Sequence, residues 1–461
     1  MSAPASSCGR EAFGHPKGLL FIAGTELWER ISFHGMLALL VLYMVERLLQ
    51  PGHIEYIAGF GGFRAAIERL TGPLSIQALA SQIVGLYIGF VYLMPIFGGL
   101  LGDRLLGRRR TVALGALLMT IGHFCMAFER SFLIALALLV LGAGCLRGNL
   151  ASQLGDLYPK ADHRRENAFQ IYYVLLNTGA FLAPLITGAL AVSFGWHYGF
   201  GFAGFGMLVG LLIYVAGRRE VPADLARRRA AEQRRLNPTD KRTIAFMVLM
   251  LPLLTAFWIA QTQIWNTYNL WARDHVNLMI GGFRMPVPWL QAVDSLAVIV
   301  LVPPMLKFWH WQDRGGREPD DFAKLGLGCL LFGLAVSWLG VTQLLVPGRV
   351  PLAWAIAYHF ISGVGYIYFA PVALALYSRS APAAVNALMI GVYYLSMFAG
   401  SAISGRIGGL YERWSSTEFW LLHAVIVSAG GLLLLLLAPR LRRELGMAPA
   451  HGRAREHAPE V

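Results

Sequence analysis

Long apolar runs alternate with short polar segments along most of this 461-residue chain. A transmembrane helix needs about 20 mostly apolar residues, and twelve runs come close to that length. Six of them lie in the first half, at residues 19–44, 79–101, 111–127, 132–154, 168–192 and 198–216. Six more lie in the second half, at residues 244–271, 289–308, 325–345, 352–377, 385–407 and 419–437. The pattern therefore predicts an all-α membrane protein with twelve transmembrane helices.

The composition agrees with a surface that faces lipid. Hydrophobic residues make up 56% of the chain and charged residues only 14%, whereas soluble domains carry about 25% charged residues. The 51 glycines suit helices that approach one another closely in a membrane. Of the four cysteines, Cys125, Cys145 and Cys329 lie inside apolar runs, so we interpret them as packing residues.

The net charge of +13 raises the question of nucleic-acid binding, but the basic residues are distributed in another way. They gather in alternate loops, at residues 104–110, 160–165, 218–242 and 440–443, while residues 193–198 and 345–351 hold almost none. Lysine and arginine concentrate in cytoplasmic loops. We therefore expect both termini in the cytoplasm of a bacterium, an inner-membrane location, and no nucleic-acid partner. The polar start lacks a signal-peptide core.

A basic segment divides the chain into two six-helix bundles. We expect bundles at 1–217 and 243–440, a cytoplasmic linker at 218–242 that forms a basic helix on the membrane surface, and a cytoplasmic tail at 441–461. A weak repeat supports the division, because Asp103 and Arg104 follow the second span as Asp313 and Arg314 follow the eighth. This plan resembles the major facilitator superfamily, whose duplicated halves surround a midplane site.

The loop after the second span carries a more specific sign of that superfamily. Gly99, Asp103, Gly107 and Arg108 occur in the run GLLGDRLLGRR, which resembles the superfamily's loop motif. The resemblance implies that these residues latch helix ends together in one conformational state. The alternative is an ordinary basic anchor at the membrane surface.

Three charged residues lie within the first predicted span. Glu26, Glu29 and Arg30 are spaced so that they share one helical face. Ionisable residues inside a membrane are energetically unfavourable and typically functional. One arginine cannot neutralise two carboxylates, so one acid should exchange protons near neutral pH. The alternative is a purely structural ion pair.

The same residues open a series of motifs that resemble one family of transporters. ELWER at 26–30 resembles the E-x-x-E-R motif of proton-dependent oligopeptide transporters, and related segments follow in order at 87–95, 142–158, 171–179, 257–263 and 365–371. The resemblance implies that Glu26, Glu29 and Arg30 couple protons. It also implies that Tyr87, Arg147 and Asn177 line the substrate pocket, with Arg147 in place of the family's lysine.

This chain departs from the family pattern where peptide ends are usually bound. Leu37 replaces an arginine, Thr262 and Tyr366 replace glutamates, and the paired tyrosines are Phe33 and His34. The standard clamp for a zwitterionic peptide is therefore incomplete. We expect substrate contacts from Phe33, His34, Trp258, Gln263, Asp294 and Tyr366 in addition to the three residues named above.

Two of these expected contacts carry open alternatives. Asp294 is expected to be a second proton site or a contact for a substrate cation, and the alternative is a helix cap. His34 is either a titrating group or a packing residue. His359 faces the same ambiguity, and we leave it out of the expected site.

These observations favour a proton-coupled symporter that imports di- or tripeptides or peptide-like solutes by alternating access, with atypical specificity. A proton-coupled drug or metabolite exporter and a non-concentrative sensor with a transporter fold are the alternatives. We find no nucleophile triad and no metal cluster in the sequence. A phosphate loop is not indicated either, because the glycine-rich segment with Gly59, Gly61 and Gly62 is expected in an outer loop. We therefore expect no enzymatic activity, no cofactor other than the coupling proton, and a monomer in the lipid bilayer.

Overall fold

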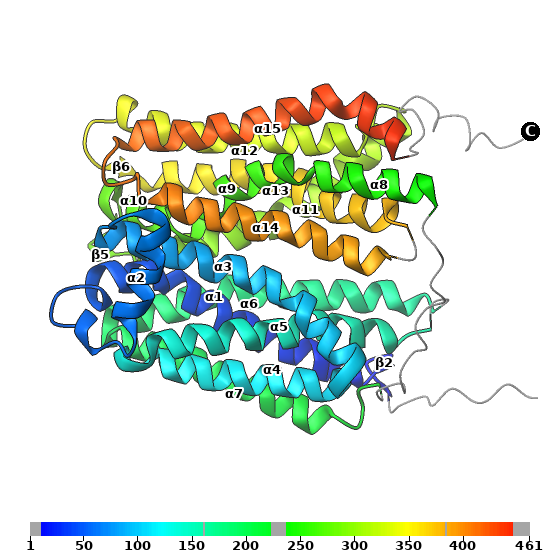
Figure 1. The fold of residues 1–461 in the computed structure, drawn as a ribbon, viewed down its shortest axis with the longest axis horizontal. Coiled ribbons are helices and arrows are strands. Elements are labelled where there is room, and N and C mark those ends of the chain that lie inside the picture. The colour runs from blue at the N-terminus through cyan, green and yellow to red at the C-terminus, as the bar shows by residue number, and fades with distance from the viewer. Residues whose placement is uncertain (1–10, 160–161, 223–236, 383–384, 446–461) are drawn as a thin grey trace, which may run out of the picture. The chain divides into compact units, whose positions relative to one another are not determined.

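The computed structural model describes residues 11–159, 162–222, 237–382 and 385–445. In these ranges the chain is nearly all helical, with only six two-residue strands (Figure 1). The helices form two compact units. The first comprises residues 1–76, 90–229 and 286–292, and the second comprises residues 77–89, 230–285 and 293–461.

The first unit is built from the helices of the first half of the chain. Its helices are α1 (Gly18–Tyr43), α2 (Phe60–Thr71), α4 (Arg108–Met126), α5 (Phe132–Asp156), α6 (Arg164–Phe194) and α7 (Trp196–Gly217), with short helical turns at Met44–Leu48, Ile54–Tyr56, Gly102–Leu106 and Glu129–Ser131. Strands β1 (Glu11–Ala12) and β2 (His15–Pro16) pair antiparallel ahead of α1. Within this unit α1 packs against α6 and α7, and α4 packs against α5 and α7.

Seven helices of the described part of the chain lie entirely in the second unit. These are α8 (Pro238–Leu249), α9 (Leu251–Thr262), α10 (Thr267–His275), α12 (Asp321–Leu345), α13 (Leu352–Ser380), α14 (Asn386–Gly408) and α15 (Ser416–Glu444), with a short turn at Gln263–Trp265. Strands β3 (Val276–Asn277) and β6 (Val350–Pro351) pair in parallel, and β4 (Met279–Ile280) pairs antiparallel with β5 (Phe283–Arg284). In this unit α12 packs against α13 and α15, and α9 packs against α14 and α15.

Two helices contribute to both units. Helix α3 (Ile76–Leu101) places residues 77–89 in the second unit and residues 90–101 in the first. Helix α11 (Trp289–Arg314) begins in the first unit and continues in the second from residue 293. The compact units therefore differ from the two halves expected from the sequence in two short segments. Residues 77–89 belong to the second unit, and residues 286–292 belong to the first.

Among the described residues, eleven helices are long and apolar enough to cross a membrane. The one expected span that is not among these eleven, at 111–127, also forms a helix, α4. This helix begins with three consecutive arginines, Arg108 to Arg110. These charges lower the apolar character of a helix that is only 19 residues long. The other expected spans each have a counterpart among the eleven.

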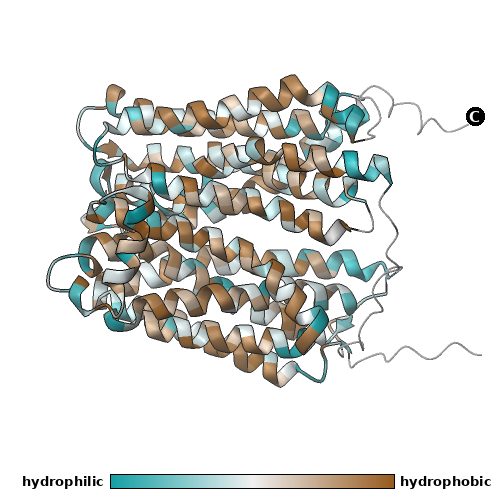
Figure 2. Cartoon of the chain, in the orientation of Figure 1, coloured by the Kyte–Doolittle hydropathy of each residue, from teal (hydrophilic) through white to brown (hydrophobic). Residues whose placement is uncertain are grey.

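Apolar side chains remain exposed along the helices. Ile134 and Leu141 of α5 are exposed, as are Leu432, Leu433 and Leu436 of α15. Figure 2 shows hydrophobic residues along the helices and hydrophilic residues gathered at helix ends and loops. Contiguous apolar surface of this kind is unfavourable in water, so the exposed side chains fit a chain that is integral to a lipid bilayer.

The span expected at 244–271 is interrupted. It consists of α8, α9 and α10, with breaks near Met250 and Asn266. Pro252 lies in the first turn of α9, where its missing N–H removes no helical hydrogen bond. Asn266 leaves helical geometry, with φ −117° and ψ −110°, and donates a 2.6 Å hydrogen bond to the Ser81 hydroxyl of α3.

The outer loop between the first two spans also contains more structure than expected. Gly59 has a positive φ of 75°, and α2 begins directly after it. The glycines at 59–62 therefore start a short amphipathic helix and do not form an open loop.

The predicted linker helix and the predicted tail lie largely outside the described residues. Residues 223–236 of the linker and residues 446–461 of the tail are not among them.

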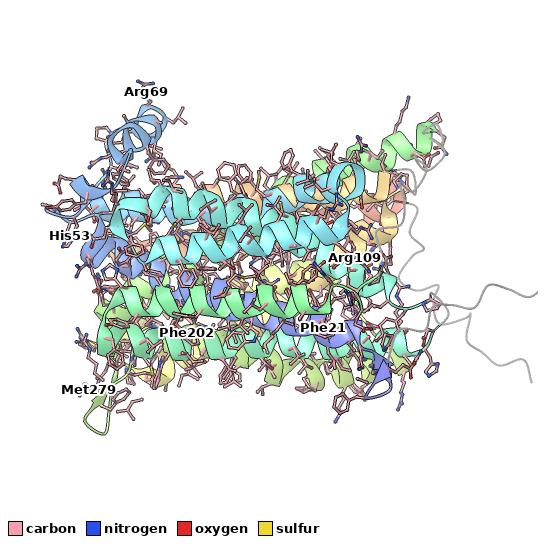
Figure 3. All side chains as sticks on the ribbon, turned by 90° about the horizontal axis from the view of Figure 1, so that it is seen from below. Phe21, His53, Arg69, Arg109, Phe202 and Met279 are labelled. Carbon is pink, nitrogen blue, oxygen red and sulfur yellow. The ribbon has the colours of Figure 1, made fainter. Side chains whose placement is uncertain are left out.

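The basic loops of the first unit are tied to neighbouring backbone. Arg109, at the start of α4, donates a 2.8 Å hydrogen bond to the Pro222 carbonyl and another to the Val221 carbonyl. Figure 3 shows Arg109 at one end of the helices of this unit and His53 at the other. The arginine thereby fixes the chain where it leaves α7.

Candidate functional site

Glu26, Glu29 and Arg30 lie together in the interior of the first unit. The two carboxylates are buried, with 1% and 0% of their surface exposed. Arg30 donates to Glu26 Oε1 through Nε at 2.9 Å and Nη2 at 2.6 Å. Its Nε also lies 3.3 Å from Glu29 Oε2. The helical spacing read from the sequence therefore does bring the three charges onto one face of α1.

A second guanidinium reaches the same cluster from another helix. Arg147 of α5 donates to Glu29 Oε1 through Nε at 3.2 Å and Nη2 at 3.1 Å. The sequence predicts one base for two acids in this cluster, whereas the structure places a second base there. Two carboxylates face two guanidinium groups, so the fully ionised cluster has a formal charge of zero.

Aromatic side chains complete this cluster, which we call the α1 charge cluster (Glu26, Glu29, Arg30 and Arg147). The Arg147 guanidinium lies 4.0 Å from the centre of the Phe33 ring, a cation–π arrangement. Phe33 meets His34 edge to face at 5.2 Å. Two of the expected substrate contacts, Phe33 and His34, thus adjoin the charged residues.

Two further residues of the first unit belong to this site and were not among the expected contacts. Tyr172 of α6 interacts electrostatically with Glu26 and Arg30. His123 of α4 is fully buried, interacts with Glu29, and has no hydrogen-bond partner among the described residues. A histidine inside the apolar run 111–127 was the signal that could have identified it.

Close helix packing positions Arg30. Gly179 of α6 lies against α1 so tightly that a Cβ atom there would come within 2.7 Å of the Leu27 carbonyl oxygen and 2.9 Å of Arg30 Cβ. Only glycine permits this approach. Small residues at helix contacts allow backbones in membranes to come close together, and here the contact holds the guanidinium beside both carboxylates.

The structure does not bring every expected pocket residue of the first half to this cluster. Asn177 of α6 donates its side-chain amide to the Tyr173 carbonyl of its own helix at 2.8 Å. Tyr87 is buried in the part of α3 that belongs to the second unit. The role of Tyr87 in the substrate pocket stays a prediction.

The expected contacts in the second unit separate into two groups. Trp258 of α9 packs edge to face on Tyr366 of α13, with ring centres 6.5 Å apart. Gln263 is fully buried and holds elements together, because its Nε2 lies 3.0 Å from both the Ser404 carbonyl and His423 Nε2 and its Oε1 accepts from Thr267. These amide contacts indicate a structural role for Gln263.

Asp294 of α11 has a histidine partner in α13. It is the sixth residue of α11, beyond the positions where a side chain caps a helix, so the capping alternative does not apply. Its Oδ1 lies 3.3 Å from Nδ1 of His359 in α13. His359, which the sequence reading excluded, is therefore the partner of Asp294.

The loop motif forms a small ion-pair network in the first unit. Arg108 lies 3.0 Å from Asp103 and 2.7 Å from Asp156 at the end of α5. Gly107, which directly precedes α4, has a φ of 79°, a conformation that other residues adopt with strain. Gly99 lies in α3, with open space where a Cβ would be. Asp156 was not among the expected latch residues.

The described residues contain no group of three histidine, cysteine, aspartate or glutamate side chains that could hold a metal ion. The groups of the α1 charge cluster are themselves ionic. Their chemistry consists of proton exchange and the pairing of guanidinium groups with carboxylates.

The helical architecture is that of the major facilitator superfamily, and the comparisons with known proteins specify the family. The POT family model matches residues 109–224 and 220–421. The chain belongs to the POT family. It is a membrane transporter of the family in which the sequence motifs placed it.

Relatives match along almost their whole length. The chain is 28% identical to the uncharacterized transporter YclF of Bacillus subtilis (strain 168), covering 94% of this chain and 96% of the relative. It is 27% identical to the peptide transporter YePEPT of Yersinia enterocolitica, with the same coverage. A crystal structure of a peptide transporter POT in complex with sulfate superposes with a TM-score of 0.83 at 27% identity, covering 94% of this chain and 97% of that one.

Proposed function

We propose that this protein imports peptides or peptide-like solutes together with protons, by alternating access. The observation that carries the proposal is the buried α1 charge cluster, in which Arg147 of α5 is held by Glu29 of α1. The similarity to transporters whose names state peptide or di-/tripeptide transport supports the substrate class.

A proton can control Arg147 in this geometry. When Glu29 is ionised, it holds the Arg147 guanidinium through two hydrogen bonds. When Glu29 binds a proton, the attraction weakens and the cluster gains a net charge of +1. The Arg147 guanidinium is then available to a carboxylate of the solute, which is its natural partner. Proton binding and solute binding are thereby linked through one residue.

The substrate is expected to differ from a standard zwitterionic peptide. By the motif resemblance, Leu37, Thr262 and Tyr366 stand where family members usually carry the charges of a peptide clamp. Thr262 shares a hydrogen bond with the Ser401 hydroxyl at 3.1 Å. Modified, cyclic or less charged peptide-like solutes fit such a site. A relative at 28% identity has been crystallised, as a mutant, in complex with alafosfalin.

We propose the inner membrane of a bacterium as the location of this protein. The alternating basic loops support an inner-membrane protein with both termini in the cytoplasm. The protein is proposed to act as a monomeric transporter and not as an enzyme, with the proton as its coupling ion and no resident cofactor.

The test is uptake by purified protein in proteoliposomes with an imposed pH gradient. Glu29→Gln should abolish concentrative uptake of a dipeptide, because the amide cannot release a proton. The same variant should retain exchange of labelled for unlabelled dipeptide, which needs no gradient. Glu68→Gln, which alters a glutamate paired with Arg64 on α2, is the matched control. Concentrative uptake by Glu29→Gln at the wild-type level would disprove the mechanism.

A further inference from the structure

Asp294 and His359 form a second pair of ionisable side chains, located in the second unit. The Asp294 carboxylate of α11 lies 3.3 Å from the His359 imidazole of α13. The His359 side chain is fully buried, whereas 19% of the Asp294 side chain is exposed. The pair therefore has one partner that is fully buried and one that is partly exposed.

Aromatic residues surround the imidazole. The Tyr268 ring of α10 meets His359 edge to face at 5.0 Å and stacks on the Tyr358 ring at 5.0 Å. The hydroxyls of both tyrosines and Nε2 of His359 have no hydrogen-bond partner in the described part of the chain. These polar atoms are thus left in an apolar setting, in which an uncompensated charge is unfavourable.

The groups around Asp294 set the charge of the pair. Tyr268 and Tyr358 are the titratable groups that face the pair from the elements packed around it. Within the described ranges, no lysine or arginine is ion-paired with Asp294. With a neutral imidazole the pair carries a charge of −1, and one bound proton brings it to zero.

The α1 charge cluster differs in this respect. It is neutral when all its groups are ionised, so a proton that binds there has to weaken an arginine contact. The pair at Asp294 needs no such displacement. A proton bound at the Asp294 carboxylate can be shared with His359 Nδ1 across the 3.3 Å contact, and no arginine contact has to break.

We propose that Asp294 and His359 form a second proton-binding site, which takes up one proton and releases it during the transport cycle. This site is separate from Glu29. The binding of a proton stands on the geometry of the pair alone, while its use in coupling rests on the proposed function.

The first experiment measures proton binding without transport. Infrared difference spectra of the purified protein in nanodiscs are recorded between about pH 5 and about pH 8, where histidine titrates. Asp294→Asn should lose the bands of one titrating group relative to wild type, and His359→Gln, which keeps the carboxylate, should shift the midpoint of that titration. Asp274→Asn, at an exposed aspartate paired with Arg273, should leave the spectrum unchanged apart from its own carboxylate band. Spectra in which Asp294→Asn and His359→Gln match wild type would overturn the site.

The second experiment measures coupling. The reversal potential of dipeptide flux in proteoliposomes gives the number of protons carried per solute. Asp294→Asn should carry one proton fewer than wild type and Asp274→Asn the same number. An unchanged number in Asp294→Asn refutes the role in coupling. If wild type concentrates no peptide or peptide-like solute under a pH gradient, the proposed function fails, whereas the infrared titration still decides whether the proton site exists.

Discussion

Glu29 is contacted from two directions, by Arg30 of its own helix and by Arg147 of α5. All three side chains lie in the interior of the first unit, and Glu29 is completely buried. Removing one partner of a buried ion pair leaves an uncompensated charge, which typically costs about 3–5 kcal/mol. Removing both opposite charges avoids most of that cost. We therefore expect the free energy of unfolding to respond differently to single and to paired substitutions in this cluster.

We predict that Arg147→Leu lowers the free energy of unfolding by about 3–5 kcal/mol, because Glu29 loses its α5 partner. The double variant Arg147→Leu with Glu29→Gln should recover more than half of this loss. Chemical unfolding of the purified protein in detergent, followed by tryptophan fluorescence, measures both. Additive losses in the double variant would show that the two residues are not coupled.

At this scale the sequence predicted the partners within a helix but not those between helices. The spacing of Glu26, Glu29 and Arg30 follows from the helical repeat alone. The contacts of Arg147 with Glu29, and of His359 with Asp294, join residues that are 118 and 65 positions apart. Such contacts depend on how helices pack, which a single sequence does not reveal.

Helix α6 reaches α1 through a glycine. Gly179 leaves room for the Leu27 carbonyl and the Arg30 Cβ, where an added methyl group would overlap both. Well-packed interiors resist added volume, and overpacking costs about 1–3 kcal/mol. The position of Arg30 thus depends on the packing of α6 against α1 at an uncharged residue, Gly179.

Gly179→Ala should destabilise the protein by about 1–3 kcal/mol and should also reduce proton-driven uptake, because α1 and its charges are displaced. The matched control is Gly201→Ala in α7, where no atom lies within 4 Å of an added Cβ. That variant should be neutral or slightly stabilising, since alanine favours helix over glycine by about 1 kcal/mol. Thermal unfolding of the two variants side by side makes the comparison. Equal stability of both would contradict the packing argument.

The elements were predicted better than their interruptions. Long apolar runs located the membrane helices because lipid exposure requires them. The breaks at Met250 and Asn266 were not foreseen, since the run 244–271 remains apolar across both. Asn266 is held by Ser81 of α3, a contact from a distant part of the sequence. Helix α2 was missed because its glycines suggested a loop.

Charge asymmetry between alternate loops belongs to the whole molecule. The basic loops carry the arginines at 104–110 and 440–443, and the opposite loops at 193–198 and 345–351 carry at most one arginine each. Positively charged loops remain on the cytoplasmic side during insertion. This bias predicts a single orientation for the chain.

A green fluorescent protein fused after Val461 should therefore be fluorescent in bacterial cells, and an alkaline phosphatase fused there should be inactive. The paired control inserts each reporter after Pro347, in the loop between α12 and α13, where the outcomes should be reversed. Whole-cell fluorescence and phosphatase assays give the answer directly. An active phosphatase at the C-terminus would refute the orientation.

The neutrality of the α1 charge cluster also has an electrical consequence. A group with no net charge gives the membrane voltage nothing on which to act, whereas one elementary charge moved across the full field corresponds to about 2.3 kcal/mol per 100 mV. The α1 charge cluster gains a net charge of +1 when Glu29 binds a proton, and the membrane voltage then exerts a force on it. The resting potential of the cell would then act on the α1 charge cluster in its protonated form and not in its ionised, neutral form.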